Sequence, residues 1–198
     1  MNIHTKKAAL ELRVNGETRA ADPFPGQRLS ELLREDLGQR DVKIGCDAGD
    51  CGACTVLLNG APVCACLTSA HQATGKEVET VQGLHASDPI AARLTQSFLD
   101  HGASQCGICT PGMVVSAVAL LRQVPEPSEE QVKDALGGVL CRCTGYRKII
   151  DAVMNVPAVA VDTKGGVGEA IQHLDGLEKI SAQVKYGDDV APPGCLEV

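Results

Sequence analysis

Hydrophobic and polar residues alternate over much of residues 8–80, which is typical of β-strands. The alternation is clearest at three apolar positions separated by charged ones: Leu10, Leu12 and Val14. Asn15-Gly16 supplies a hairpin turn after them, and Asn59-Gly60 supplies another between two apolar runs, 55–58 and 63–67. A short helix is predicted over 29–37. The pattern therefore predicts a small α+β unit.

After about residue 84 the apolar residues recur at helical spacing instead. Four helices are predicted, and most carry their own start or stop signal. These features are Asp88-Pro89 before the first helix, Thr110-Pro111 before the second, the Ser128 and Gln131 capping box and Gly137-Gly138 end of the third, and the apolar spacing over 146–156 of the fourth. The second half is therefore expected to be all-α. Residues from about 157 onward are rich in Gly and Pro and show no independent core.

Composition limits the kinds of protein this chain can be. Its 198 residues are 44% hydrophobic but only 2% aromatic, so the core must be aliphatic. The net charge of −7 argues against a nucleic-acid partner. No apolar run approaches the ~20 residues of a membrane span, and the first residues contain no signal-peptide core. We therefore expect a cytoplasmic protein with reduced thiols.

Nine of the ten cysteines fall in four tight groups. The first group is Cys46, Cys51 and Cys54, whose C-x4-C-x2-C spacing is that of plant-type [2Fe–2S] ferredoxins. Such a cluster takes four thiolates, and Cys64 and Cys66 are both candidates for the fourth. Spacing alone leaves that choice open. Glycines among these thiols suit a loop that turns its N–H groups toward sulfur, although a zinc site is the alternative.

The next two pairs of thiols each precede a predicted helix: Cys106 with Cys109, and Cys141 with Cys143. Helix N-termini carry free N–H groups and partial positive charge, which stabilise thiolates and anionic clusters. Two such pairs can converge on one metal centre, with zinc again a rival to iron. The tenth cysteine, Cys195, is isolated, and the five histidines have no ligand spacing. No nucleophile–base arrangement is found, so this chain alone is expected to do no bond chemistry.

Three segments resemble the iron–sulfur subunit of the molybdenum hydroxylases, the xanthine dehydrogenase and aldehyde oxidoreductase family: 45–56, 105–113 and 141–146. The resemblance implies a β-grasp plant-type ferredoxin domain over 1–84, a four-helix domain over 85–160 and an extended tail over 161–198. It also implies the fourth ligand of the first cluster, with eleven residues between it and Cys54, at Cys66. Cys64 is then a spare thiol. The second cluster would take all four remaining thiols: Cys106, Cys109, Cys141 and Cys143.

The same resemblance implies partners that this chain does not contain. A large subunit would carry the molybdopterin cofactor, which Gln105 and the backbone around Cys143 would contact. Electrons would pass from molybdenum through the helical-domain cluster and the ferredoxin-domain cluster to FAD, on a flavin subunit that a cytochrome subunit can replace. Substrates of the family include N-heterocycles, purines, aldehydes and CO. The alternatives are a free-standing ferredoxin-like carrier and a zinc- or cluster-bound structural protein.

The tail departs from the usual small subunit, which ends soon after the fourth helix. Several of its residues are similar to the opening of the molybdenum subunit in this family: Val167-Gly168, His173 to Asp175, Glu178 to Ile180, Ala182 to Tyr186, Asp189 and Pro193-Gly194. We expect the tail to lie along the large subunit rather than to form a domain of its own. A disordered linker is the alternative.

Overall fold

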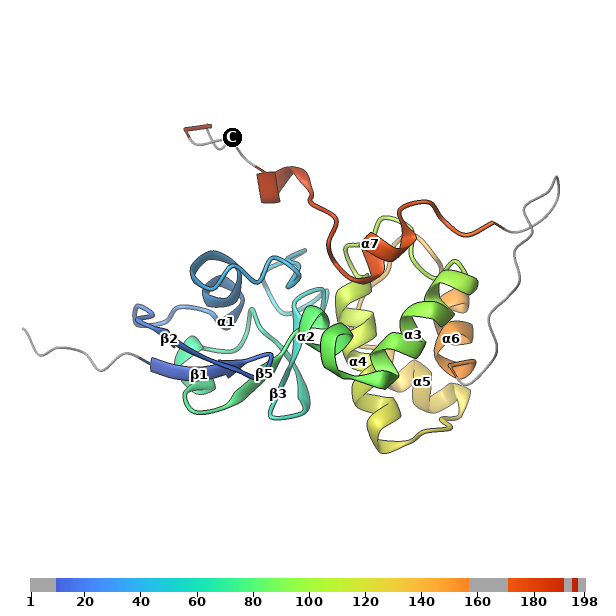
Figure 1. The fold of residues 1–198 in the computed structure, drawn as a ribbon, viewed down its shortest axis with the longest axis horizontal. Coiled ribbons are helices and arrows are strands. Elements are labelled where there is room, and N and C mark those ends of the chain that lie inside the picture. Colours follow the sequence, from blue (N-terminus) through green and yellow to red (C-terminus); the bar gives the residue numbers. More distant parts are fainter. Residues whose placement is uncertain (1–9, 157–170, 191–193, 196–198) are drawn as a thin grey trace, which may run out of the picture.

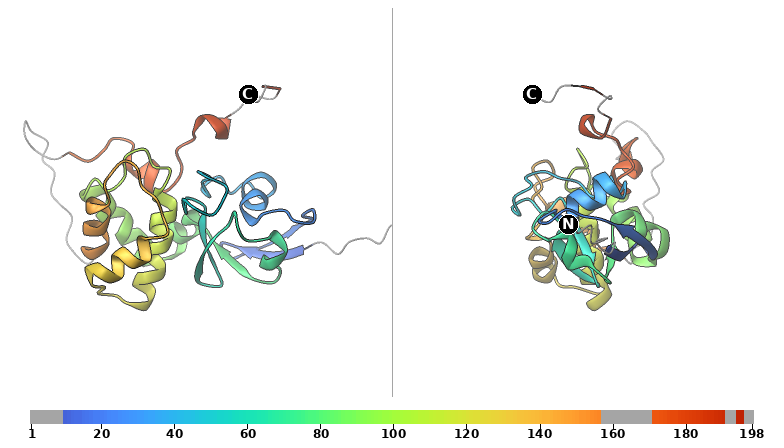
Figure 2. Two further views of the ribbon diagram at one scale, coloured as in Figure 1. Left: turned by 180° about the vertical axis from the view of Figure 1, so that it is seen from behind. Right: turned by 90° about the vertical axis from the view of Figure 1, so that its left-hand side faces the viewer.

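The fold consists of a sheet unit and a helical unit that lie side by side, with the tail crossing both (Figures 1 and 2). It was obtained as a computed structural model. The structure describes residues 10–156, 171–190 and 194–195. Two predicted tail features, Val167-Gly168 and Pro193, lie outside the described residues.

The sheet has five strands in the order β2-β1-β5-β3-β4. The pairing of β1 with β5 is parallel, and the other three pairings are antiparallel. Their bounds are Leu10–Val14 for β1, Glu17–Ala21 for β2, Thr55–Leu58 for β3, Ala61–Cys64 for β4 and Glu77–Glu79 for β5. Both predicted turns are present, because each Asn-Gly pair has two positive φ values and so matches the twist of its hairpin.

One helical segment packs against this sheet and completes its core. It begins as α1, Leu29–Glu31, and continues as a π-helical turn, η1, over Leu32–Asp36. Leu29, Leu32 and Leu33 are fully buried against the inward side chains of β1 and β3. The 3₁₀ turn η2, Ala70–Ala73, adds two further buried alanines. The hydrophobic core of the sheet unit is therefore aliphatic, as its composition requires.

The helical unit surrounds one almost entirely buried helix, α4. The helices are α2 (Val81–Ser87), α3 (Pro89–Asp100), α4 (Thr110–Gln123), α5 (Glu129–Leu136) and α6 (Arg147–Met154). Eleven of the fourteen residues of α4 are buried, which is typical of a helix that is apolar on all sides. Leu57 of β3 also joins this core, so the sheet and the helices share a packed interface.

These features confirm the predicted α+β fold, a β-grasp ferredoxin domain followed by helices. The caps predicted at Asp88 and Ser128 are present, and α5 ends at Leu136, directly before the two glycines. The described part of the tail is extended except for α7 (Gly176–Ile180) and the 3₁₀ turn η3 (Gly187–Val190). Among the described residues, no helix has the length and apolar character to cross a membrane.

Candidate metal centres

The first cysteine loop, between η1 and β3, turns its backbone N–H groups toward one thiol. Three N–H groups lie 3.3 Å from Cys46 Sγ, those of Ala48, Asp50 and Cys51. They lower the pKa of Cys46 to about 7, and the Ala48 N–H is the largest cause. The Cys51 thiol also lies close to Cys46 and lowers its pKa further. The loop is thus built to hold a thiolate and the negative charge of a metal cluster.

Two of the remaining thiols of this site are more deeply buried. Cys54 and Cys66 are both 3% exposed, and they lie close enough for Cys66 to affect the pKa of Cys54. Burial raises the pKa of Cys54 to about 12, although the Cys66 N–H opposes that rise. Cys64 is half-buried, and it too lies close enough to Cys54 for that thiol to affect its pKa. The structure therefore brings both candidates to the site, and the assignment of Cys66 as the ligand stays a prediction.

The second set of thiols joins two loops that are distant in sequence. The Cys106 thiol lies close enough to Cys143 to affect its pKa, and the Cys141 thiol affects the pKa of Cys109 in the same way. Cys109 is the N-cap residue of α4, and burial raises the pKa of its thiol well above the ordinary value. Burial acts to raise the pKa of Cys141, but the hydroxyl and N–H of Thr144, with smaller contributions from the Cys143 N–H and Cys109, outweigh it and lower that pKa. The Thr144 hydroxyl lies 3.1 Å from Cys141 Sγ.

This second site is partly exposed to solvent. Cys106 and Cys143 are exposed, whereas Cys109 is buried in the helical core. Gln105 is exposed beside Cys106, and its side chain makes no hydrogen bond within the described part of the chain. A ligand at Cys106 and Cys143 would therefore be accessible from outside, with a free amide at its edge.

The two thiol loops meet at the interface between the domains. The N–H of Leu140, the residue before Cys141, donates to the carbonyl oxygen of Cys51 at 2.8 Å. Glycine permits this close approach, because a Cβ on Gly112 would lie 2.5 Å from the carbonyl oxygen of Gly52. The two candidate centres are therefore connected by one backbone hydrogen bond between residues at or next to their thiols.

Comparisons with known proteins match both parts of the chain to families that bind [2Fe–2S] clusters. Residues 12–84 match the family described as 2Fe-2S iron-sulfur cluster binding domain, and residues 80–154 match the [2Fe-2S] binding domain family. The nicotinate dehydrogenase small FeS subunit of Eubacterium barkeri is 49% identical over 74% of this chain and 93% of its own length. The nicotine 6-hydroxylase small subunit of Paenarthrobacter nicotinovorans is 42% identical over 76% of this chain and 90% of its own. The chain belongs to the iron–sulfur subunits of the molybdenum hydroxylase family.

Solved structures of the family extend this similarity to the fold. The aldehyde oxidoreductase of Desulfovibrio desulfuricans superposes with a TM-score of 0.82 at 34% identity, over 91% of this chain and 22% of that much longer one. The quinoline 2-oxidoreductase of Pseudomonas putida superposes with a TM-score of 0.71 at 44% identity, over 74% of this chain and 90% of its own. The predicted resemblance to the iron–sulfur subunit is therefore confirmed.

The donor set of each site suits a [2Fe–2S] cluster, since both sites are built from thiols. A [2Fe–2S] cluster has two irons that share four thiolates, so its ligands are expected in two pairs. Both sites show such pairs, and the N–H groups around Cys46 match the negative charge of a cluster.

One residue of the second thiol site, Tyr146, was not predicted from the sequence to take part in it. Tyr146, expected only as the first residue of a helix, precedes α6 with a φ of 66°. Its hydroxyl accepts a hydrogen bond from the N–H of Cys141 at 2.9 Å and donates one to the carbonyl of Val139. A bulky residue in this left-handed conformation often marks a functional constraint. The Cys-Arg-Cys-Thr-Gly-Tyr segment contained the signal, since Tyr146 closes it.

Proposed function

We propose that this chain is the electron-transfer subunit of a molybdenum hydroxylase complex. It would carry two [2Fe–2S] clusters between a molybdopterin site and FAD, or another acceptor, on partner chains. The observation that supports this proposal is the pairing of thiols at two separate sites whose loops share a hydrogen bond. Each cluster, when bound, would accept and release single electrons, while the substrate would react on a partner chain.

The proposed ligands follow the two sites. The first cluster would be held in the ferredoxin domain by Cys46, Cys51, Cys54 and Cys66. The second would be held in the helical domain by Cys106, Cys109, Cys141 and Cys143. The N–H groups around Cys46, and the hydroxyl and N–H of Thr144 at Cys141, would stabilise the negative charge that each cluster places on its sulfurs.

Exposure suggests how the partners are arranged. The open side of the second site carries Gln105 and Cys143, which we propose to face the pterin of the large subunit. The ferredoxin-domain cluster would then face the FAD or cytochrome subunit. The tail also presents apolar side chains to solvent, which a partner would cover: Ile171, Leu174, Leu177 and Val190. We propose that this side of the tail lies along the molybdenum subunit.

The substrate is expected to be a small molecule of the family's range: an N-heterocycle, a purine, an aldehyde or CO. We favour an N-heterocycle, because the relatives named for nicotinate and nicotine are 49% and 42% identical to this chain, against 38% and 40% for two xanthine dehydrogenase subunits. The cytoplasmic location expected from the sequence stays a prediction.

Iron and sulfide analysis with EPR tests the proposal. The protein would be purified anaerobically with any partners that co-elute, and then reduced with dithionite. Four irons, four labile sulfides and two distinct [2Fe–2S] signals per chain are expected. Cys143→Ala should remove one signal, whereas Cys195→Ala, which changes another exposed cysteine, should keep both. One signal in the unmodified chain, or zinc in place of iron at the second site, would contradict the proposal.

A further inference from the structure

The tail does more than extend away from the second domain, because residues 176–190 contact both domains. We call this segment the strap. Its first part, α7, packs on the helical unit, where Ile180 and Ala182 are buried in the helical core. The ring of His85 in α2 also lies 3.3 Å from the carbonyl oxygen of Ile180. The strap then crosses to the sheet unit, where Asp189 of η3 pairs with Arg34 of η1.

Between these two ends, the strap touches the loop that begins the second thiol site. The Tyr186 hydroxyl donates a hydrogen bond to the carbonyl oxygen of Cys106 at 2.7 Å. The next residue of the loop, Gly107, has a φ of +91°, and a Cβ there would lie 2.5 Å from the Tyr186 hydroxyl. The loop and the strap are therefore in direct contact, with no room for a larger residue at Gly107.

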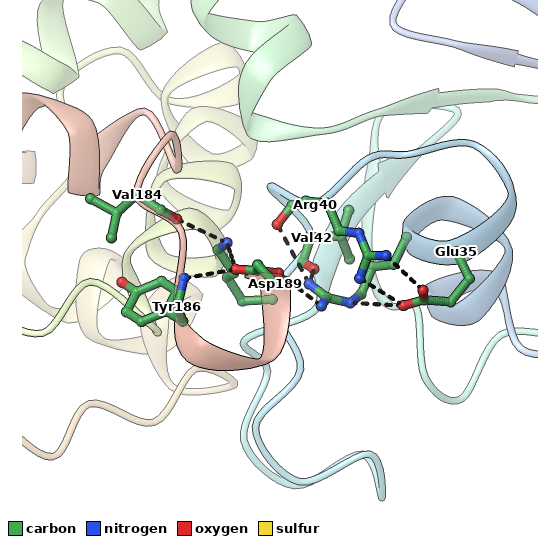
Figure 3. Close-up of polar contacts among 8 residues, drawn as sticks. Glu35, Arg40, Val42, Val184, Tyr186 and Asp189 are labelled. Atoms are coloured by element: carbon green, nitrogen blue, oxygen red, sulfur yellow. Dashed lines mark hydrogen bonds and ion pairs between the residues drawn. The ribbon is translucent and has the colours of Figure 1, made fainter. Parts of the chain in front are cut away.

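At its far end the strap buries a carboxylate between two cations of the ferredoxin domain. Asp189 lies 3.0 Å from the Arg34 guanidinium and 3.2 Å from the Lys43 ammonium (Figure 3). All three side chains are only 4% exposed. The N–H of Tyr186 also donates to Asp189, at 3.1 Å, and Lys43 lies 5.0 Å from the centre of the Tyr186 ring. Tyr186 and Asp189 are thus parts of one polar network.

The position of these cations connects the network to the first thiol site. Lys43 is three residues before Cys46, and Arg34 lies in η1, the helical turn that precedes the loop. The guanidinium of Arg34 also donates to the carbonyl of Val42 at 2.8 Å, so it holds the chain next to Lys43. Buried charges of this kind are costly to leave unpaired, so replacing Asp189 is expected to destabilise the network.

We propose that residues 176–190 are an intrachain strap that fixes the two cluster domains against each other and positions the Cys106 loop. Tyr186 and Asp189 are its positioning residues. This inference rests on the proposed function for its statement about the second cluster, but the contacts between strap and loops do not depend on a bound cluster. The strap's other side is left available to a partner subunit.

The test compares the full chain, purified with its co-eluting partners, with Tyr186→Phe, Asp189→Asn and the control Lys185→Ala, which changes an exposed neighbour on the strap. Tyr186→Phe keeps the ring over Lys43 and removes only the hydroxyl. Amide hydrogen exchange in residues 105–109 should become about five-fold faster, the effect of losing one hydrogen bond. The EPR signal and midpoint potential of the second cluster should shift, while those of the first stay unchanged.

Asp189→Asn should accelerate exchange both in the strap and in residues 34–46, because Arg34 and Lys43 both lose the charge of Asp189, the partner that they share. Lys185→Ala should do neither. Unchanged exchange and an unchanged second-cluster potential in Tyr186→Phe would overturn the inference. Equal acceleration throughout the chain would overturn it as well, since that indicates general destabilisation. Missing cluster signals in the unmodified protein would instead refute the proposed function, and the exchange data would still decide the role of the strap.

Discussion

Replacing Gly52 by alanine tests whether the contact between the two thiol loops holds the domains together. Gly52 has a φ of +65°, and a Cβ there would overlap the carbonyl oxygen of Gly138 in the helical domain and lie 3.0 Å from its carbonyl carbon. The left-handed conformation costs an alanine about 1 kcal/mol. Forcing an extra carbon against a packed backbone costs about 1–3 kcal/mol more. Gly52→Ala is therefore expected to destabilise the chain by about 2–4 kcal/mol.

Two other glycines allow the conformational cost and the steric cost to be measured separately. Gly60 has a φ of +81° with nothing within 4 Å of its Cβ position, so Gly60→Ala should cost only the conformational strain, about 1 kcal/mol. Gly112 has no positive φ, but its Cβ would lie 2.5 Å from the Gly52 carbonyl oxygen. Gly112→Ala should therefore cost only the steric part, about 1–3 kcal/mol.

Urea unfolding, followed by circular dichroism and by the visible absorbance of the clusters, measures the difference. With a slope of about 2 kcal/mol per M, Gly52→Ala should lower the midpoint by about 1–2 M and Gly60→Ala by about 0.5 M. Leakage of the clusters should accompany unfolding of Gly52→Ala and Gly112→Ala, because both changes push the thiol loops apart. Equal midpoints for Gly52→Ala and Gly60→Ala would show that the close approach has no energetic importance.

Three further outcomes follow from the described contacts. Cys66→Ala should lose the first [2Fe–2S] EPR signal, whereas Cys64→Ala should retain both signals, and the reverse result would move the fourth ligand to Cys64. Ser128→Ala removes the capping box of α5 and should cost about 1 kcal/mol by thermal or urea unfolding; an unchanged midpoint would show that the cap is dispensable. The pKa of Asp189 is lowered, since the Tyr186 N–H and the nearby cations outweigh the burial that raises it. Its stabilisation is therefore present above the ordinary carboxyl pKa of 3.8 and is lost as the pH falls below it, so proteolysis of the strap should increase in acid but change little between pH 6 and 8.

Local signals predicted most of the elements but not how distant segments meet. The alternation at Leu10, Leu12 and Val14 coincides with β1, and the predicted caps at Asp88 and Ser128 lie directly before α3 and α5. By contrast, β5 is three residues long, and its pairings with β1 and β3 are all that define it. So short a segment has no periodicity of its own, and its partners are not visible from its sequence.

At the candidate sites, too, the sequence predicted local groups of residues but not the contacts between distant segments. Spacing identified the thiols of each loop, because a cluster loop needs its ligands close together in sequence. Spacing could not separate Cys64 from Cys66, and both approach Cys54 in the structure. The contacts of the strap could not be predicted from the sequence. Asp189 is separated from Arg34 by 155 positions, and the surrounding Gly- and Pro-rich sequence suggested no core. Ile180 is buried only because another domain supplies the core.

Together these contacts fix the distance between the two thiol sites. The loops meet directly at the hydrogen bond from Leu140 to Cys51, and glycines exclude side chains from that contact. The strap adds a further connection between the same domains, from Cys106 to the residues just before Cys46. Connections at separate places resist hinge motion better than a single one, since a hinge needs a single line about which to rotate. The proposed electron-transfer role requires this rigidity, because an electron carrier acts by holding its centres at fixed positions between partners.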